Sequence, residues 1–170
     1  LLNETATAAL FATDNPEMGL RLLSQNNGKF TDITQKAGIN GSELSYGLGI
    51  GISDINEDGW PDFYVSNDYA VPDYLYINQK NGAFQNKISS MIGHTSQFSM
   101  GNDIADINND GSSDIFTLDM LPEDNKRQKL LIAPDNFAKF EQNVRSGFYY
   151  QYMRNMLHLS NQNGTFSEIG

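Results

Sequence analysis

One nine-residue pattern occurs twice in this chain of 170 residues. The stretch from Asp54 to Asp62 reads DINEDGWPD and the stretch from Asp106 to Asp114 reads DINNDGSSD, so both follow D-x-N-x-D-G-x-x-D. Oxygen-bearing side chains at alternating positions, a glycine at the sixth and a closing aspartate at the ninth suit a turn around a hard cation that takes six to eight oxygens. The pattern therefore predicts two calcium loops.

The similarity between the two copies extends beyond the loops themselves. Gly49 and Ile52 precede the first loop as Gly101 and Ile104 precede the second. Short runs rich in β-branched and aromatic residues flank both loops, which is typical of strands. Because the copies begin roughly fifty residues apart, the chain has the period of a repeat architecture.

A second repeated element, N-G-x-F, follows an apolar run at three places, beginning at Asn27, Asn81 and Asn163. An Asn-Gly pair between such runs is the strongest short-range signal for a β-hairpin. One unit is then strand, calcium loop, strand, connection, strand, turn and strand. Four strands in such a unit indicate the blade of a β-propeller.

The predicted fold is all-β, with about two and a half four-stranded blades and a short helical insertion. We expect residues 1–170 to form one propeller segment: 20–35 the outer half of a preceding blade, 46–88 a complete blade, and 98–170 a second blade. A closed ring usually needs four to eight blades. The remaining blades are therefore expected to come from a longer parent chain or from elsewhere.

The second unit carries an insertion over residues 121–155, because its closing hairpin arrives about 30 residues later than in the first unit. We expect two short helices there, roughly Glu123 to Ile132 and Asp135 to Ser146, between the second and third strands of that blade. Pro134 supplies a start signal and Gly147 a stop signal. Three apolar residues have the spacing of one helical face: Phe137, Phe140 and Val144.

The ligands of each predicted ion can be assigned by position. In the first loop they are the side chains of Asp54, Asn56, Asp58 and Asp62 and the carbonyl of Trp60, with Gly59 at the bend. In the second loop they are Asp106, Asn108, Asp110 and Asp114 and the carbonyl of Ser112, with Gly111 at the bend. An EF-hand also needs an acid at position twelve, where these loops have Val65 and Thr117. All-oxygen ligands disfavour zinc, and Mg²⁺ usually keeps several waters.

Two other interpretations of the loops remain open. Asp, Asn and Gly also make good turns without any metal. If calcium does bind, five protein ligands leave little room for a substrate, so we expect the ions to hold the blades together and predict no catalytic residues. The rival is a hydrolase or lyase with its active site in the propeller pocket, using acids such as Asp103, Asp119 or Glu123.

Composition restricts the partners. The chain has a net charge of −10, and no basic face is available to meet the phosphates of a nucleic acid. No apolar run is long enough to span a membrane, and the N-terminal residues lack the basic start of a secretory signal, so a signal, if one is used, lies outside this chain. An aromatic cluster is either the insertion's own packing surface or a patch for a protein or glycan partner: Phe148, Tyr149, Tyr150 and Tyr152.

Both loops resemble those of FG-GAP and VCBS repeat proteins, a group that includes the blades of integrin α-subunits. More narrowly, GKFTDITQKAGI, GLGIGISDINEDGWPDFYVSND and GTFSEIG look like the VCBS-type proteins related to cartilage acidic protein 1, common in Bacteroidetes. The resemblance implies an extracellular or outer-membrane-associated propeller, usually of seven blades, with structural Ca²⁺. A minimal repeat of this kind lacks the insertion. We expect a binding or scaffold module for a protein or polysaccharide at the cell surface.

Overall fold

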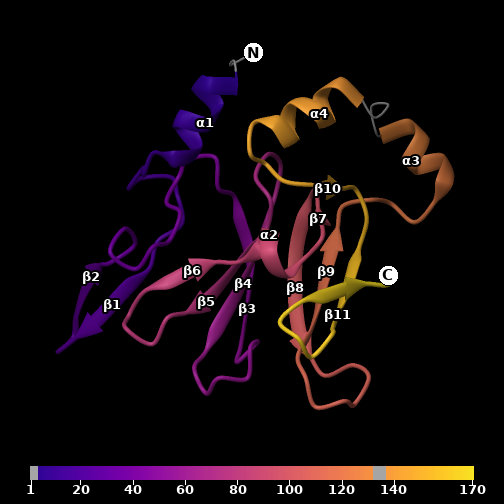
Figure 1. Cartoon of the computed structure of the whole chain (residues 1–170). Helices are drawn as coiled ribbons and strands as arrows, with labels where there is room; N and C mark the ends of the chain where they lie inside the picture. Colours follow the sequence, from indigo (N-terminus) through magenta and orange to yellow (C-terminus); the bar gives the residue numbers. More distant parts are fainter. Residues whose placement is uncertain (1–3, 132–136) are drawn as a thin grey trace.

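Two antiparallel four-stranded sheets dominate the computed structural model, which describes residues 4–131 and 137–170 (Figure 1). The first sheet has the order β3 (Gly47–Ser53), β4 (Asp62–Asn67), β5 (Tyr74–Asn78) and β6 (Phe84–Asn86). The second has the order β8 (Ser99–Ala105), β9 (Asp114–Asp119), β11 (Met156–Ser160) and β12 (Phe166–Glu168). Each sheet is a meander of the kind expected for a propeller blade, so the predicted all-β fold class is confirmed. The described residues form no closed ring.

The remaining elements lie around these sheets. On the N-terminal side are α1 (Glu4–Ala12) and the hairpin of β1 (Leu23–Asn26) with β2 (Lys29–Asp32). Along the chain, the first sheet is followed by α2 (Ile88–Met91) and β7 (Thr95–Ser96), and the second sheet begins after them. The insertion contributes α3 (Asn125–Leu131), α4 (Phe137–Arg145) and β10 (Gln151–Tyr152), and β10 pairs with β7 in parallel. No helix was predicted at the N-terminus, where α1 lies.

The insertion lies between β9 and β11, the second and third strands of its sheet. Helix α3 begins at Asn125 and not at Glu123, α4 ends at Arg145 and not at Ser146, and the predicted boundaries at Ile132 and Asp135 lie outside the described residues. Helix α4 ends before Gly147, whose φ of 87° is the left-handed conformation of a helix stop. Phe137 is 71% exposed and α4 buries none of its residues, so its apolar spacing does not mark a buried helix face.

All three predicted hairpins are present, but they are of two kinds. Asn27 and Gly28 form a two-residue turn with φ of 48° and 78°, as the Asn-Gly signal predicts. In both blades the loops are longer, at residues 79–83 and 161–165, and the positive φ falls on the residue before the Asn-Gly pair as well as on the glycine. The two blade hairpins therefore share a conformation that the first hairpin lacks.

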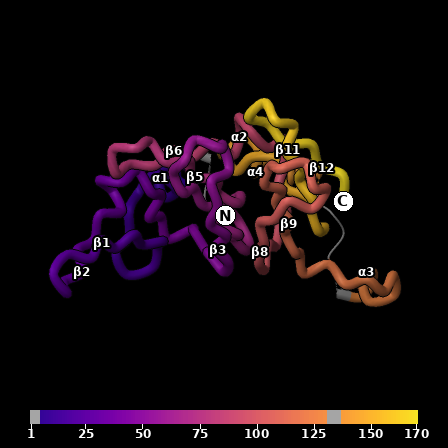
Figure 2. The backbone as a smooth tube through the Cα atoms, turned by 90° about the horizontal axis from the view of Figure 1, so that it is seen from below, coloured from indigo at the N-terminus to yellow at the C-terminus, as the bar shows by residue number. Residues whose placement is uncertain are grey.

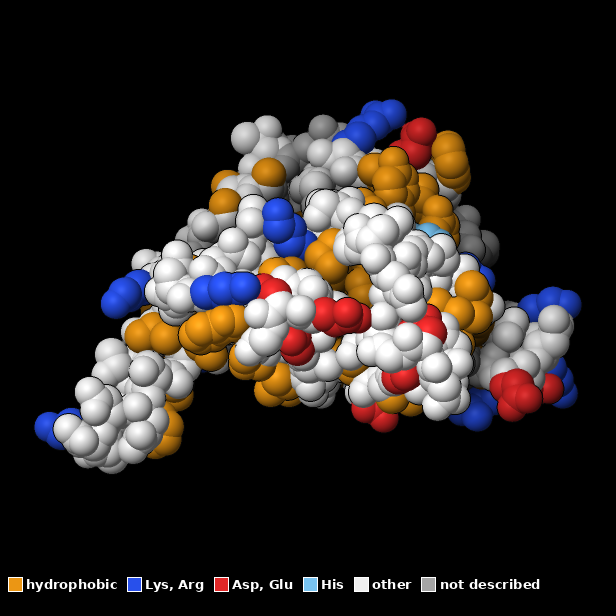
Figure 3. Space-filling view, turned by 60° about the horizontal axis from the view of Figure 1, so that its bottom comes forward, with side chains coloured by type: hydrophobic (Ala, Val, Ile, Leu, Met, Phe, Trp, Pro, Cys, Tyr) orange, Lys and Arg blue, Asp and Glu red, His pale blue; other side chains and the backbone are white. Residues whose placement is uncertain are grey.

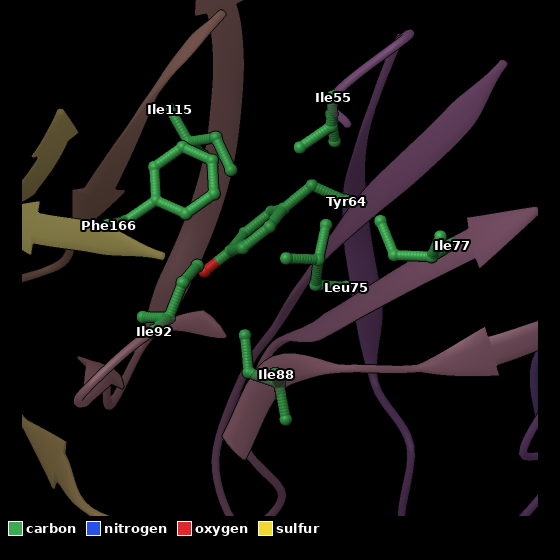
Figure 4. Packing of buried hydrophobic residues seen from close by; sticks show 8 residues of the cluster. All are labelled: Ile55, Tyr64, Leu75, Ile77, Ile88, Ile92, Ile115 and Phe166. Atoms are coloured by element: carbon green, nitrogen blue, oxygen red, sulfur yellow. The ribbon is translucent and has the colours of Figure 1, made fainter. Parts of the chain in front are cut away.

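The main core lies between the two sheets (Figure 4). Side chains on β4 alternate between faces, and Tyr64 points toward the second sheet while Phe63 and Val65 point the other way. The buried members of this core are Ile55, Tyr64, Leu75, Ile77, Ile88, Ile92, Ile115 and Phe166. A second cluster packs the other face of the first sheet against the N-terminal segment, and it consists of Ala37, Ile39, Val65, Val71, Tyr74, Tyr76 and Phe148.

The innermost strands of the two blades, β3 and β8, lie side by side (Figure 2). Their close approach requires glycine, because a Cβ on Gly49 would lie 2.9 Å from the Cα of Gly101 and 3.3 Å from the backbone nitrogen of Asn102. The same face of β3 contributes Ser53, whose hydroxyl lies 2.9 Å from that of Ser113. Contact at this inner edge therefore depends on small side chains.

The opposite face of β3 is apolar and uncovered. Leu48 is 44% exposed, Ile50 is 61% exposed and Ile52 is 66% exposed. In the second blade the residues equivalent to Ile50 and Ile52 are Asn102 and Ile104, which lie against the glycines of β3. The exposed face of β3 thus has the form of a surface that another inner strand would cover.

Asp73 joins the two blades from within the core. It is fully buried, and its carboxylate accepts hydrogen bonds from the Tyr64 hydroxyl (2.6 Å), the Asn67 backbone N–H (2.8 Å) and the Ser99 hydroxyl (2.7 Å). Ser99 belongs to the second blade and the other two donors to the first. Burial raises the pKa of Asp73 to about 7, although these three donors oppose the shift.

The contact between β3 and β8 can be tested with a pair of equivalent glycine substitutions, one in each strand. We expect Gly49→Ala to lower the free energy of unfolding by roughly 1–3 kcal/mol, because the new methyl group collides with backbone atoms of β8. The equivalent Gly101→Ala should be neutral or slightly stabilising, because a Cβ there meets no described atom within 4 Å. Urea unfolding of both variants measures the difference, and equal effects would contradict the role given to the inner-strand contact.

The buried acid generates a pH prediction. Since the pKa of Asp73 is raised from 3.8 in the unfolded chain to about 7, the folded state binds its proton more tightly. The stability contributed by Asp73 is therefore present below about pH 4 and is lost as the pH rises toward 7. We expect the free energy of unfolding of the wild type, relative to Asp73→Asn, to fall by on the order of 4 kcal/mol across this window. Urea titrations at several pH values measure it, with Asp103→Asn as the exposed control; parallel profiles would refute the shift.

Candidate metal centre

Both predicted metal loops lie at the same end of the sheets, opposite the helices (Figure 1). One connects β3 to β4 and the other connects β8 to β9. Acidic side chains gather on this end in the space-filling view (Figure 3). The repeat places the two loops on neighbouring blades, where each joins the first two strands.

The first loop is closed by its own backbone amides. Asp54 accepts the N–H of Asp58 on Oδ1 (2.9 Å) and the N–H of Gly59 on Oδ2 (2.7 Å). Asn56 Oδ1 also accepts the N–H of Asp58 (3.2 Å), and Asp58 Oδ1 accepts the N–H of Trp60 (3.0 Å). These side chains therefore all point inward along the loop.

The second loop repeats the same bonds residue by residue. Asp106 accepts the N–H of Asp110 (3.0 Å) and of Gly111 (2.9 Å), and Asn108 Oδ1 accepts the N–H of Asp110 (3.0 Å). Asp110 Oδ1 accepts the N–H of Ser112 (2.9 Å). Backbone angles agree as well, because φ is positive at the fourth and sixth positions of both loops: Glu57 (57°), Gly59 (86°), Asn109 (59°) and Gly111 (93°).

The closing aspartates, Asp62 and Asp114, connect each loop to the third strand of its blade, which the sequence pattern alone did not predict. Asp62 and Asp114 are fully buried, and one oxygen of each accepts an N–H from the start of its own loop, that of Ile55 (3.0 Å) or Ile107 (3.0 Å). The other oxygen of each accepts an N–H from the third strand of the blade, that of Asn78 (2.8 Å) or Ser160 (2.9 Å). Each closing carboxylate thereby joins the loop to the rest of its blade.

The electrostatics differ between the exposed and the buried acids. Burial raises the pKa of Asp62, against hydrogen bonds from Asn78 and Ile55 that favour its charged form. For Asp58, desolvation acts in the same direction but is outweighed, so hydrogen bonds from Asn56 and Lys80 lower its pKa. In the second loop the backbone N–H of Ser112, followed by the side chain of Asn108, lowers the pKa of Asp110.

The donor set fits a hard cation, since every assigned side chain offers oxygen and each carboxylate oxygen of Asp54 has a lone pair beyond the one its amide occupies. Among residues 4–131 and 137–170, however, no three acidic or imidazole groups converge as they would around an ion. In each loop an asparagine Nδ2 donates to the fifth-position carboxylate, Asn56 to Asp58 (3.0 Å) and Asn108 to Asp110 (2.9 Å). Calcium binding would have to displace these two donors, and it stays a prediction.

The four aromatic residues of the candidate partner surface are separated by the structure. Phe148 is only 4% exposed and packs edge-on against Phe11, so burial removes it from any surface. Tyr149 donates its hydroxyl to the carbonyl of Ile92 (2.7 Å). Tyr150 and Tyr152 stay 45% and 43% exposed. Only the last two are available to a partner.

The three acids considered for a catalytic pocket lie apart. Asp103 faces Phe116 and Asp119 faces Ser99, so they stand at different levels of one sheet. Both oxygens of Asp119 accept hydrogen bonds, from the Ser96 hydroxyl (2.6 Å) and from the backbone N–H groups of Phe98 (3.0 Å) and Leu121 (2.9 Å). Glu123 lines a separate recess beside Arg154. Asp119 therefore anchors a connection between strands.

Residues 54–117 match the model of the FG-GAP-like repeat. The match begins at the first residue of the first metal loop and ends just after the second loop, so it covers the segment from one loop to the next. It supports an FG-GAP repeat protein, which is the broader part of the predicted resemblance; no comparison shows the similarity to relatives of cartilage acidic protein 1.

Integrin alpha-3 from two rodents is similar to part of the chain. The Cricetulus griseus protein is 33% identical over 109 residues, covering 55% of this chain and 10% of the relative. The Mus musculus protein is 32% identical over 109 residues, with the same coverage. The chain therefore spans about a tenth of the length of these curated relatives. Together with the repeat match, they support an FG-GAP repeat protein.

Sequence reasoning missed two charged residues, Asp73 in the core and Lys80 beside the first loop. Asp73 follows Pro72 in a connection and has no motif around it. Lys80 could have been found by aligning the N-G-x-F hairpins of the two blades, in which Lys80 and Gln162 hold the same position.

No helix within residues 4–131 or 137–170 combines the length and apolar character needed to cross a membrane.

The closing aspartates should matter even without a metal. We expect Asp114→Ala to lower the free energy of unfolding in chelator by roughly 1–3 kcal/mol, because the partly buried N–H groups of Ile107 and Ser160 lose their acceptor. Asp103→Ala is the matched control, since the carboxylate of Asp103 is exposed and, in the part of the chain that the structure describes, accepts one hydrogen bond, from the N–H of Ile104 (2.9 Å). Chemical unfolding measures both, and an Asp114→Ala effect within 0.5 kcal/mol of the control would contradict this role.

Proposed function

We propose that this chain is a calcium-stabilised segment of an extracellular FG-GAP repeat propeller that serves as a binding or scaffold module. The observation that carries the proposal is the duplicated loop, which has the same side-chain bonds, the same backbone angles and the same closing aspartate in both blades. Two unrelated turns would not be expected to agree in all three respects.

Calcium would supply positive charge to loops that each hold three aspartate carboxylates, to which the first loop adds Glu57. The residues that would hold it are those assigned from the pattern: Asp54, Asn56, Asp58, Asp62 and the carbonyl of Trp60 in one loop, and Asp106, Asn108, Asp110, Asp114 and the carbonyl of Ser112 in the other. Their work is structural, because the buried oxygens of Asp62 and Asp114 already join each loop to a third strand. An ion there would stiffen a whole blade and perform no chemistry.

Further blades from the parent protein would cover the exposed face of β3. Ile50 and Ile52 are available on this face, and their equivalents Asn102 and Ile104 lie against the glycine face of a neighbouring inner strand. In this proposal the β1–β2 hairpin is the outer half of a preceding blade. The exposed face of β3 would fit against an inner strand that has small residues at alternate positions.

The location and partner belong to the same proposal. Integrin alpha-3 is a relative of the repeat segment, and the quoted stretches resemble VCBS-type propellers, so a cell-surface or outer-membrane-associated protein that contacts another protein or a polysaccharide is the best-supported role. Tyr150 and Tyr152 are the exposed aromatic residues that such a contact would use. Their half-exposed rings suit either kind of partner.

The calcium requirement is directly testable. We expect millimolar Ca²⁺ to raise the thermal unfolding temperature of the chain above its value in chelator, because an ion that binds only the folded state stabilises it by mass action. The double variant Asp58→Ala and Asp110→Ala should lose this rise, since it removes one ligand from each loop. Differential scanning calorimetry with and without EDTA makes the measurement.

A matched control changes the same net charge away from the loops, with Asp103→Ala and Glu17→Ala, and should keep the full calcium effect. Titration calorimetry of the chelated wild type should then give two ions per chain. An absence of binding at millimolar Ca²⁺ would refute the calcium proposal and leave the loops as metal-free turns.

A further inference from the structure

The first metal loop already has a positively charged neighbour of its own. Lys80 lies in the loop between β5 and β6, and its ammonium group is 3.3 Å from Oδ2 of Asp58. The same nitrogen is within 3.4 Å of the backbone carbonyl of Asp58. Asp58 is the fifth-position ligand of the predicted site, so a protein cation occupies the approach to a carboxylate that calcium would need.

The second blade builds the same hairpin without this cation. Gln162 takes the place of Lys80, with φ of 56° against 61°. The N–H of Lys80 donates to Asn78 Oδ1 (2.9 Å), and the N–H of Gln162 donates to the Ser160 hydroxyl (3.2 Å). Because the backbone is alike, both side chains start from equivalent positions above their loops.

Lys80 and Gln162 differ in the charge that they bring to their loops. Gln162 is neutral, and its side chain, near Asp110, is among the groups that lower the pKa of that carboxyl. Lys80 brings a full positive charge to Asp58 and holds that carboxylate in the metal-free loop. A bound Ca²⁺ would be repelled by an ammonium at this distance, whereas a neutral amide would impose no such cost.

We propose that Lys80 is an internal competitor of calcium, so that the first loop binds the ion more weakly and depends on it less than the second loop does. This inference rests on the calcium proposal above and adds an order of filling, in which the Asp106–Asp114 loop loads first. In the metal-free protein Lys80 stands in for the ion at the first loop, and within residues 4–131 and 137–170 no lysine or arginine forms an ion pair with an aspartate of the second loop. The two repeats are then structurally alike but different in calcium dependence.

The size of the effect follows from the exposure of the pair. The Lys80 side chain is 48% exposed, so solvent screens its field and the difference between the loops should be modest. We expect about a tenfold difference in dissociation constant, which corresponds to roughly 1.4 kcal/mol. High salt should reduce the difference, because screening weakens exposed charge interactions most.

The test exchanges the two residues. Lys80→Gln should tighten calcium binding at the first loop by about tenfold, and Gln162→Lys should weaken binding at the second loop by a similar factor. Each loop is isolated by disabling the other with Asp110→Ala or Asp58→Ala, and titration calorimetry gives its dissociation constant. Lys29→Gln makes the same charge change on the β1–β2 hairpin and should alter neither loop.

A second readout needs no metal. In EDTA, Lys80→Gln should lower the thermal unfolding temperature by a few degrees because Asp58 loses its countercharge, and Gln162→Lys should raise it. If the wild type binds two ions but the exchange leaves both dissociation constants unchanged, the role of Lys80 is overturned while the calcium proposal stands. If the wild type binds no calcium at all, both proposals fall together.

Discussion

The structure depends most on a buried carboxylate that accepts hydrogen bonds from two separate parts of a blade. Asp62 and Asp114 each take one N–H from the beginning of a loop and another from the end of a third strand. A lone buried carboxylate would be costly, and these donors offset much of that cost. The arrangement means that loop conformation and strand pairing are not independent. A change at the loop reaches the sheet through one side chain, which is why an ion held there would act on the whole blade.

Packing between blades obeys a different constraint. At the inner edge the contact is made by backbone atoms of β3 and β8, which only glycine allows at Gly49. Further out, large side chains such as Tyr64 and Phe166 fill the space between the sheets (Figure 4). Blades that touch at one edge and diverge at the other form a wedge, and wedges placed side by side build a ring. The uncovered apolar face of β3 is the matching surface on the other side of the first wedge.

Sequence reasoning succeeded where signals were local and repeated. The loop pattern placed β3, β4, β8 and β9, and the N-G-x-F elements placed the hairpins, because turn chemistry depends on a few adjacent residues. Contacts made by residues distant in sequence were missed. Asp73 acquires its buried position from Ser99 of the other blade, and Phe148 becomes a core residue through Phe11. Neither partner is visible in the surrounding residues. Helix α1 was missed because its apolar and polar residues follow no helical periodicity.

The position of Phe148 also changes what the insertion can do. The segment after α4 places Phe148 in the cluster beneath the N-terminal segment, Gln151 Nε2 donates to the carbonyl of Ala70 (3.0 Å), and β10 pairs with β7. These contacts reach the first blade and the connection between blades. This part of the insertion therefore holds the two blades together at the end opposite the metal loops (Figure 1). Its aromatic residues are therefore divided between structure and surface: the buried ones hold the blades, and the half-exposed Tyr150 and Tyr152 lie at the surface beside Phe140. A partner bound there would contact a surface whose rigidity is provided by the same segment.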